Sequence, residues 1–194
     1  AECHARGIHV LSAAPAMAPA VAEFCLCQSI SLLRGLHRAD GLFRAGQEAY
    51  GIGGNGTAES LYGATVSLIG YGNLGRSLAP LLRPFGVRLL VHDPWLSDGY
   101  LTSEGLVPVS LDDALVQSDV VFLLAGVTSE NEGFLNRAKL GLIKRGACVV
   151  LASRAEILDF DDFLAMTGEG AFRAAVDVFP EEPVPAGHAW RDTP

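Results

Sequence analysis

Short apolar runs alternate along this chain with longer segments whose apolar residues recur at helical spacing. The runs have the length of buried strands, and the longer segments repeat their apolar positions close to every 3.6 residues, as helices do. The runs predict six strands, at Val66–Ile69, Val87–Val91, Val107–Val109, Asp119–Leu124, Ala147–Leu151 and Ala171–Val178. The periodic segments predict helices between them, at Asn73–Phe85, Leu111–Gln117, Asn136–Ile143 and Asp159–Met166.

This regular alternation of strand and helix predicts an α/β fold of the Rossmann type. We expect a doubly wound parallel sheet of six main strands, with helices on both faces and right-handed crossovers. Ligands of such sheets bind in a crevice at the carboxyl ends of the strands. Functional residues are therefore expected directly after the strands.

The first part of the chain has a different pattern. Gly7–Leu11 is a strand-like run, and Ser12–Pro19 is an Ala- and Pro-rich segment that predicts a loop. A long N-terminal helix is expected from Pro19 to Gly46. Glu48–Ser60 is rich in glycine and predicts an exposed loop.

Composition indicates a globular chain with a large core and excludes some classes of partner. Of the 194 residues, 49% are apolar and 19% are charged, and the net charge is −8. A chain of this length can bury one good core. Because the charge is negative, nucleic acid is not expected as a partner. An anionic cofactor would have to be held by backbone N–H groups and a few local arginines.

The four cysteines, Cys3, Cys25, Cys27 and Cys148, have neither zinc-ligand spacing nor the pattern of a secreted disulfide framework. We interpret them as buried thiols of a cytoplasmic protein, and we expect no metal site. By the usual length rule we expect no run to be long enough to span a bilayer, so no membrane partner is expected.

The segment Thr65–Asp93 carries the strongest functional signal. Gly70, Gly72 and Gly75 follow the first strand and open a helix, and the second strand leads to Asp93. In this context the glycine spacing predicts dinucleotide binding. Gly70 permits a tight turn, Gly72 lets the backbone approach a pyrophosphate, and Gly75 lets the helix pack close to the strand.

Two further features of this segment suit a dinucleotide. The helix that begins near Asn73 offers N–H groups and the positive end of its dipole to phosphates. Asp93 is placed to accept hydrogen bonds from ribose hydroxyls. The alternative is an ordinary strand–helix–strand turn that ends in a surface carboxylate.

Charged residues also follow the later strands. Arg154 comes after the fifth strand, where an arginine suits bidentate binding of a carboxylate, although it could be a surface arginine that merely ends a strand. Asp177 and Glu182 bracket the turn after the sixth strand. These carboxylates could orient a nicotinamide or a histidine, although Glu181 and Glu182 together could equally form a solvated acidic turn.

Five segments together resemble the D-isomer-specific 2-hydroxyacid dehydrogenases, a family that includes phosphoglycerate, D-lactate and glyoxylate/hydroxypyruvate dehydrogenases. The segments are GATVSLIGYGNLG, VHDPW, VTSENEGFLN, LASR and AAVDVFPEEP. The resemblance covers nearly the whole chain, and it implies four parts. Residues 1–18 would be a remnant of the segment leading into the cofactor domain, and residues 19–60 a linking helix and Gly-rich dimerisation loop. Residues 61–180 would be the NAD-binding Rossmann domain, and residues 181–194 the start of the return to a substrate domain that is largely absent.

The resemblance implies roles for individual residues around the cofactor. Asn73 and Leu74 match the positions whose backbone meets the pyrophosphate. Asp93 matches the acid that binds the adenosine ribose, which favours NAD over NADP because a 2′-phosphate would be repelled. Thr128 matches a threonine that lines the cofactor cleft. Ala152 and Ser153 match the strip that contacts the cofactor before the catalytic arginine.

The remaining matches concern the reaction. Arg154 matches the catalytic arginine, which also borders the cofactor, and Asp177 matches the carboxylate near the nicotinamide amide. Glu182 matches the glutamate that pairs with the catalytic histidine and raises its pKa. The implied reaction is hydride transfer between C4 of the nicotinamide and C2 of a small 2-hydroxy or 2-oxo acid. Arg154 would hold the substrate carboxylate and the histidine would exchange the hydroxyl proton. We expect that histidine to lie beyond Pro194.

Some residues depart from the family pattern. Ala155 and Glu156 stand where the family prefers glycine and another small residue, Met17 stands where an asparagine is common, and Gly126 replaces a usual proline. The altered loop of Arg154, Ala155 and Glu156 leaves open an NAD(H)-sensing, non-catalytic protein resembling the C-terminal-binding-protein corepressors. An enzyme resembling formate dehydrogenase is a nearer alternative.

The N-terminal part of the chain resembles the family's dimer-forming arm. The helix Pro19–Gly46 and the loop after it carry this resemblance. A homodimer is therefore expected. The alternative is a helix that packs only within its own chain.

Overall fold

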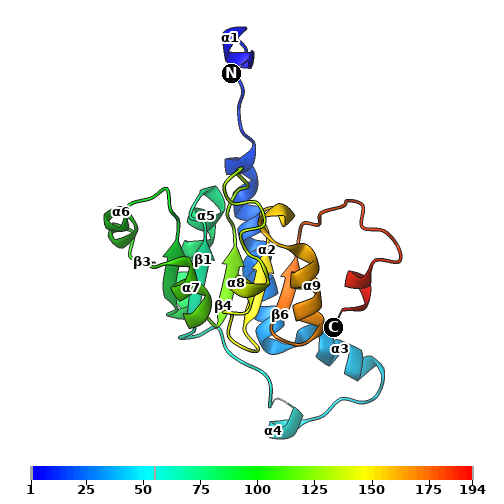
Figure 1. The fold of residues 1–194 in the computed structure, drawn as a ribbon. Coiled ribbons are helices and arrows are strands. Elements are labelled where there is room, and N and C mark those ends of the chain that lie inside the picture. Colours follow the sequence, from blue (N-terminus) through cyan, green and yellow to red (C-terminus); the bar gives the residue numbers. More distant parts are fainter. Residues whose placement is uncertain (1, 55, 194) are drawn as a thin grey trace.

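Six strands lie side by side in one parallel sheet in the computed structural model, which describes residues 2–54 and 56–193 (Figure 1). Their order across the sheet is β3-β2-β1-β4-β5-β6. The strands are β1 (Thr65–Ile69), β2 (Arg88–His92), β3 (Val107–Pro108), β4 (Val120–Leu123), β5 (Cys148–Leu151) and β6 (Arg173–Val176). The order reverses between β1 and β4, which is the switch point of a doubly wound fold. The predicted fold class is confirmed.

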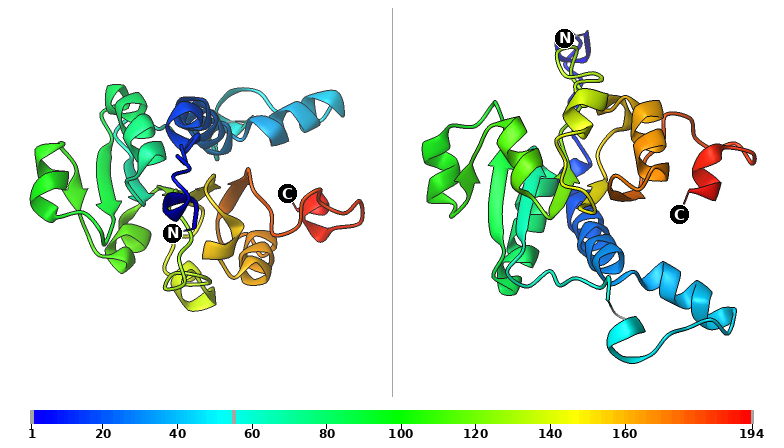
Figure 2. Two further views of the ribbon diagram at one scale, coloured as in Figure 1. Left: turned by 90° about the horizontal axis from the view of Figure 1, so that it is seen from above. Right: turned by 60° about the horizontal axis from the view of Figure 1, so that its bottom comes forward.

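Helices cover both faces of the sheet, as the view from above makes clear (Figure 2). One face carries α2 (Ala14–Arg34) and α5 (Asn73–Leu82), and the other carries α7 (Leu111–Gln117), α8 (Arg137–Leu140) and α9 (Phe160–Gly168). The other helices are α1 (Glu2–Ala5), α3 (Leu36–Arg44), α4 (Gly51–Gly54) and α6 (Asp98–Ser103), with single 3-10 turns at Arg83–Phe85, Ala155–Ile157 and Ala189–Asp192.

The two faces of the sheet have separate cores because successive side chains of a strand point in opposite directions. In β4, Val120 and Phe122 join the core beneath α2 and α5, whereas Val121 and Leu123 join the core beneath α7 and α9. All four side chains are fully buried. Strands buried on both faces read as continuous apolar runs, which is why the sequence predicts them well.

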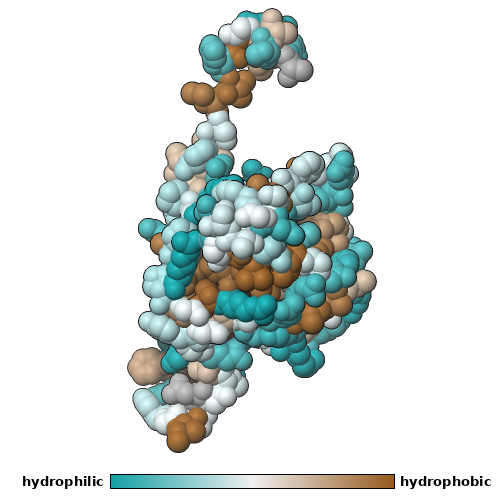
Figure 3. Space-filling view, turned by 90° about the vertical axis from the view of Figure 1, so that its left-hand side faces the viewer, coloured by the Kyte–Doolittle hydropathy of each residue, from teal (hydrophilic) through white to brown (hydrophobic). Residues whose placement is uncertain are grey.

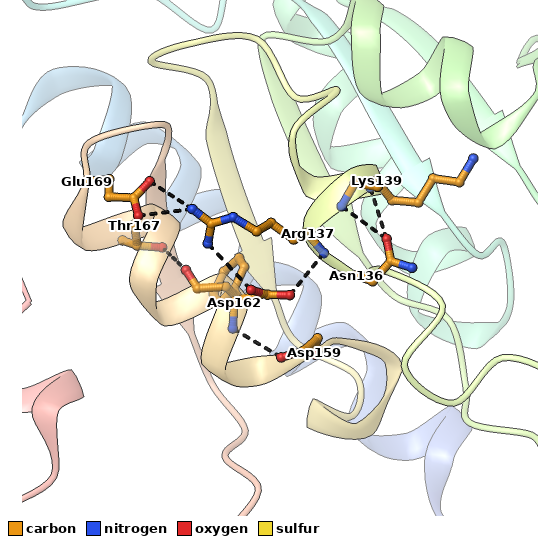
Figure 4. A network of polar contacts seen from close by, with 9 residues as sticks. Asn136, Arg137, Lys139, Asp159, Asp162, Thr167 and Glu169 are labelled. Carbon is orange, nitrogen blue, oxygen red and sulfur yellow. Dashed lines mark hydrogen bonds and ion pairs between the residues drawn. The ribbon is translucent and has the colours of Figure 1, made fainter.

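Capping side chains fix where several helices begin. Ser110 accepts a hydrogen bond from the backbone N–H of Asp113 at 3.1 Å and is therefore the N-cap of α7. Asn136 caps α8 in the same way (Figure 4). Arg137 then joins α8 to α9, because its guanidinium pairs with Asp162 at 3.4 Å and with Glu169 at 3.1 Å.

The N-terminal part of the chain differs from the sequence expectations. Gly7–Leu11 is not a strand, because no described strand lies beside it, and it projects from the body as an exposed segment (Figure 1). The predicted loop Ser12–Pro19 is largely helical, since α2 begins at Ala14 with a proline in its first turn. The predicted single helix is two helices, because Gly35 adopts φ 63° and ends α2 with a left-handed cap.

Smaller differences concern the second half of the chain. The segment after Asp93 contains α6, which Ser97 caps by accepting the N–H of Tyr100 at 3.3 Å. The predicted helix Asn136–Ile143 ends at Leu140 and continues only as a turn. The 3-10 turn Ala155–Ile157 comes before α9, and the short β6 follows that helix.

Two of the four cysteines also differ from expectation. Cys25 and Cys148 are buried, whereas Cys3 and Cys27 are exposed. Cys27 lies on α2 only two residues after Cys25, so the two side chains point to different sides of the helix.

Helix α2 corrects the expectation about membrane spans. It has 21 residues and a mean hydropathy of 1.5, so it is long and apolar enough to cross a bilayer by length and composition. Part of it, including Ala22, Cys25 and Leu33, is buried against α5 and the sheet. The core helix of a globular domain can have the same length and composition, so the length rule does not distinguish a core helix from a membrane span.

Candidate NAD-binding and catalytic site

The glycine turn after β1 is built so tightly that two of its positions exclude a side chain. Gly70 has φ 99°, and a Cβ added there would lie 2.8 Å from the Cα and N of Ala125. A Cβ at Gly75 would lie 2.9 Å from the carbonyl oxygen of Gly70. Gly70 therefore permits the turn, and Gly75 permits the close approach of α5 to β1.

Gly72 has a different role in the turn. Its φ of −79° is open to any residue, and a Cβ added there would meet nothing within 4 Å. It is the N-cap of α5, and no side chain caps that helix. The first N–H groups of α5, at Asn73 and Leu74, thus face an open space that an anion can enter.

The carboxylate of Asp93 is fixed at the end of β2 by two backbone donors. Its Oδ2 accepts a hydrogen bond from the N–H of Tyr71 at 2.8 Å, and its Oδ1 accepts one from the N–H of Trp95 at 3.0 Å. Each carboxylate oxygen keeps a further lone pair. Asp93 can therefore accept hydroxyl groups while it holds the glycine turn in place.

The loop after β4 is stabilised by one asparagine. Asn131 Nδ2 donates to the carbonyl oxygen of Gly126 at 2.8 Å, and its Oδ1 accepts the N–H of Thr128 at 2.7 Å. Thr128 itself is exposed. Asparagine commonly shapes such turns, but its partners could not be read from the sequence.

Beyond β5 the chain places a buried hydroxyl next to an exposed guanidinium. Ser153 is 8% exposed, and its Oγ has no hydrogen-bond partner among the described residues. Arg154 has extended backbone, is exposed, and donates from Nη1 to the carbonyl oxygen of Ser153 at 2.7 Å. Ala152 extends the hydrogen-bond ladder between β5 and β4, because its N–H donates to the carbonyl oxygen of Leu123.

The two remaining carboxylates lie after β6. Asp177 is exposed, and its backbone N–H donates to Leu151 at 2.9 Å. Burial and, to a smaller extent, the negative charge of Asp177 raise the pKa of the Cys25 thiol on α2 to about 12. Cys25 is therefore a protonated core side chain. Glu182 is exposed and accepts the N–H of Phe179 through Oε1 at 2.9 Å.

The sheet brings most of these residues to one edge. The turn at Gly70, Asp93, Ser153 and Asp177 follow the carboxyl ends of adjacent strands, in line with the strand order. Within the described ranges, Arg154, Asp177 and Glu182 make no hydrogen bond or ion pair with one another. Glu182 instead folds back on its own turn, so the structure places it on the segment that leaves the sheet.

Two hollows flank the domain. One of about 330 Å³ is lined by Gly133, Ala155, Glu156 and Phe160 among others and adjoins the Arg154 turn. Another hollow of about 270 Å³ opens at the opposite edge of the sheet, near Lys144, and none of the candidate site residues lines it.

Sequence reasoning missed one group of residues at this edge. Arg76, in the first turn of α5, packs its guanidinium against the rings of Tyr71 and Tyr100. The glycine spacing pointed to the turn, but α6, which carries Tyr100, was not expected. No signal in the sequence alone would have paired Arg76 with a residue 24 positions away.

These features fit a dinucleotide. The open space at Gly72, the uncapped N-terminus of α5 and the fixed carboxylate of Asp93 suit a pyrophosphate and a ribose. The buried Oγ of Ser153 needs a hydrogen-bond partner that the described residues do not supply.

Comparison with known proteins agrees with this assignment. The family model described as D-isomer specific 2-hydroxyacid dehydrogenase, NAD binding domain, matches residues 26–194. A glyoxylate reductase from Thermococcus kodakarensis is 29% identical over 187 residues, which cover 94% of this chain and 56% of that protein.

Solved structures show the same likeness. A phosphoglycerate oxidoreductase from Rhizobium etli has a TM-score of 0.89 and 38% identity, covering 98% of this chain and 61% of that chain. A D-lactate dehydrogenase from Aquifex aeolicus, solved with NAD and lactic acid, has a TM-score of 0.80 and 27% identity, covering 93% and 54%. The chain spans about half the length of the curated relatives it matches. It belongs to the D-isomer specific 2-hydroxyacid dehydrogenase family, of which it contains the NAD-binding domain.

Proposed function

We propose that the protein containing this chain is an NAD-dependent oxidoreductase acting on a small D-2-hydroxy or 2-oxo acid. The observation that carries this proposal is the exposed guanidinium of Arg154, at the same sheet edge as the glycine turn. A guanidinium is planar and offers paired donors, so it suits a substrate carboxylate. Bound NAD would supply a hydride acceptor at nicotinamide C4.

The chain's own residues have distinct roles in this proposal. Gly70, Gly72 and Gly75, with the N–H groups of Asn73 and Leu74, bind the pyrophosphate. Asp93 binds the adenosine ribose, and the loop at Thr128 borders the cleft. Ala152, Ser153 and Asp177 face the nicotinamide end, where the Oγ of Ser153 gains a partner. Arg154 orients the substrate carboxylate, and Glu182 is a positioning residue for a histidine outside this chain.

Turnover by the full-length protein tests the activity. NADH oxidation would be followed with glyoxylate, hydroxypyruvate, pyruvate and 3-phosphohydroxypyruvate, beside a direct measurement of NADH binding. The proposal predicts turnover of at least one of these oxo acids. NADH binding without any turnover would contradict it and favour an NAD(H)-sensing binding protein, for which the exposed Glu156 beside Arg154 is the supporting feature.

Cofactor selectivity tests the role of Asp93. Asp93→Ala removes the carboxylate that would repel a 2′-phosphate and that binds ribose hydroxyls. We expect the preference for NADH over NADPH to fall by about tenfold or more, in line with one charged hydrogen-bonding group. The measurement is the pair of dissociation constants, with Asp98→Ala, on the nearby α6, as the control. An unchanged ratio would refute the role.

We also propose that the protein is a homodimer formed through the arm that contains α3 and α4. The arm projects from the body (Figure 1), and its tip bears apolar surface (Figure 3). None of the side chains of α3 is buried, and Phe43 is 64% and Ile52 is 94% exposed. Large exposed apolar residues of this kind mark protein–protein contacts.

Sedimentation of a double variant tests this interface. Phe43→Glu with Ile52→Glu is expected to convert a dimer to a monomer, because two charges would be buried in an apolar contact. Helix content should stay unchanged, since both side chains are exposed in the single chain. A wild-type protein that sediments as a monomer would contradict the proposal.

The cytoplasmic location and the absence of nucleic-acid or membrane partners stay predictions.

A further inference from the structure

Arg76 is a charged side chain at the adenosine end of the site to which the proposed function gives no role. It follows Gly75 directly and lies in the first turn of α5. Its guanidinium carbon is 5.1 Å from the centre of the Tyr71 ring and 5.0 Å from the centre of the Tyr100 ring. Its Nη1 also donates a hydrogen bond to the hydroxyl of Tyr100. The cation is therefore held between two aromatic faces.

The two rings belong to the two segments that hold Asp93. Tyr71 lies in the glycine turn, is 3% exposed, and donates its backbone N–H to Asp93 Oδ2. Tyr100 lies on α6, which begins directly after the Trp95 loop, and the N–H of Trp95 donates to Asp93 Oδ1. Arg76 thus joins, through side chains, the same two segments that the Asp93 carboxylate joins through backbone groups.

A second arginine links the same helices farther from the cofactor. Arg83 lies in the 3-10 turn after α5, and its Nη2 donates to the backbone carbonyl of Glu104 at 2.6 Å, beyond the end of α6. Arg83 and Arg76 therefore both hold α6 against α5. Of these two arginines, only Arg76 packs on Tyr71, the residue whose N–H donates a hydrogen bond to the Asp93 carboxylate. Arg83 therefore provides a matched control.

We propose that Arg76 is a positioning residue for cofactor selectivity. By holding α6 and the Trp95 loop against the glycine turn, it keeps the Asp93 carboxylate oriented toward the ribose hydroxyls. This inference rests on the proposed binding of NAD at this edge. It assigns to Arg76 an effect on selectivity opposite in sign to that of a cation that binds the 2′-phosphate directly.

The sign of the change in selectivity provides the test. A cation that bound the 2′-phosphate would favour NADPH, so its loss would weaken NADPH binding more than NADH binding, and a cation that bound only the pyrophosphate would favour neither cofactor. A residue that positions Asp93 supports the contact that favours NADH, so its loss weakens NADH more. For Arg76→Ala we expect the dissociation constant of NADH to rise about tenfold. The selectivity ratio, which is the dissociation constant of NADPH divided by that of NADH, should fall about fivefold.

Calorimetry on the full-length protein would measure the dissociation constants of NADH and NADPH for Arg76→Ala and for the variants that follow. Tyr100→Phe keeps the charge and ring but removes the hydroxyl, and it should change the ratio in the same direction. Arg83→Ala should lower the melting temperature comparably while leaving the ratio within about twofold. In an Asp93→Ala background, Arg76→Ala should have no further effect on the ratio.

The outcomes separate this inference from the proposed function. If the wild-type protein binds NADH but Arg76→Ala leaves the ratio unchanged or raises it, only the positioning role is overturned. An equal fall of the ratio in Arg83→Ala would also overturn it, because stability alone would then account for the effect. If the wild-type protein binds no NADH, both the proposed function and the role of Arg76 are wrong.

Discussion

Gly70→Ala is expected to destabilise the domain by about 3 kcal/mol and to abolish detectable NADH binding. The left-handed conformation of Gly70 costs an alanine about 1–2 kcal/mol. Its Cβ would also lie 2.8 Å from the backbone of Ala125, and such overpacking costs about 1–3 kcal/mol. The backbone atoms of Ala125, just after β4, cannot rotate away as a side chain would. Denaturant unfolding followed by circular dichroism measures the loss of stability.

Gly72→Ala is the matched control, because it separates stability from binding. Its φ of −79° suits alanine, and its Cβ would meet no atom of the described residues within 4 Å, so stability should stay within about 1 kcal/mol of wild type. The added methyl group would stand where the pyrophosphate approaches. We expect the dissociation constant of NADH to rise about tenfold or more. Equal stability of both variants would refute the difference in geometry described for the two glycines.

The sheet was predictable from the sequence because its central strands, β1, β2, β4 and β5, are buried along most of their length. Such strands form unbroken apolar runs, and all six observed strands lie within the predicted runs or extend one residue beyond them. The N-terminal part was not predictable in the same way. Helical spacing continues through Gly35, so the sequence does not reveal that this glycine adopts φ 63° and separates α2 from α3.

The site was predictable to the extent that it depends on the strand ends. Because all strands are parallel, residues directly after them must meet at one edge, and Asp93, Ser153 and Asp177 do so. Contacts made by residues away from strand ends could not be inferred. The pairing of Arg76 with Tyr100 depends on α6, a short helix whose start is fixed by the side chain of Ser97.

Arg154→Gln is expected to lower kcat/KM for the preferred oxo acid by about 10²- to 10⁴-fold in the full-length protein. A bidentate contact with a carboxylate contains two charge-assisted hydrogen bonds, each worth about 1.5–3 kcal/mol. In the structure the guanidinium is exposed, and among residues 2–54 and 56–193 it is held only by the carbonyl oxygen of Ser153, so it is free to turn toward a substrate. Initial rates at varied oxo-acid concentration would measure the effect.

Two controls distinguish this role from a general effect of charge. Arg145→Gln removes another exposed arginine, near the amino ends of the strands, and should leave kcat/KM unchanged. Arg154→Lys keeps the charge but loses the planar pair of donors, so we expect it to recover only part of the lost activity. The NADH dissociation constant should change much less than kcat/KM in both Arg154 variants, because the substrate carboxylate is the group that loses its partner. A loss of less than about tenfold in Arg154→Gln would mean that the carboxylate is bound elsewhere, since even one charge-assisted hydrogen bond accounts for that much.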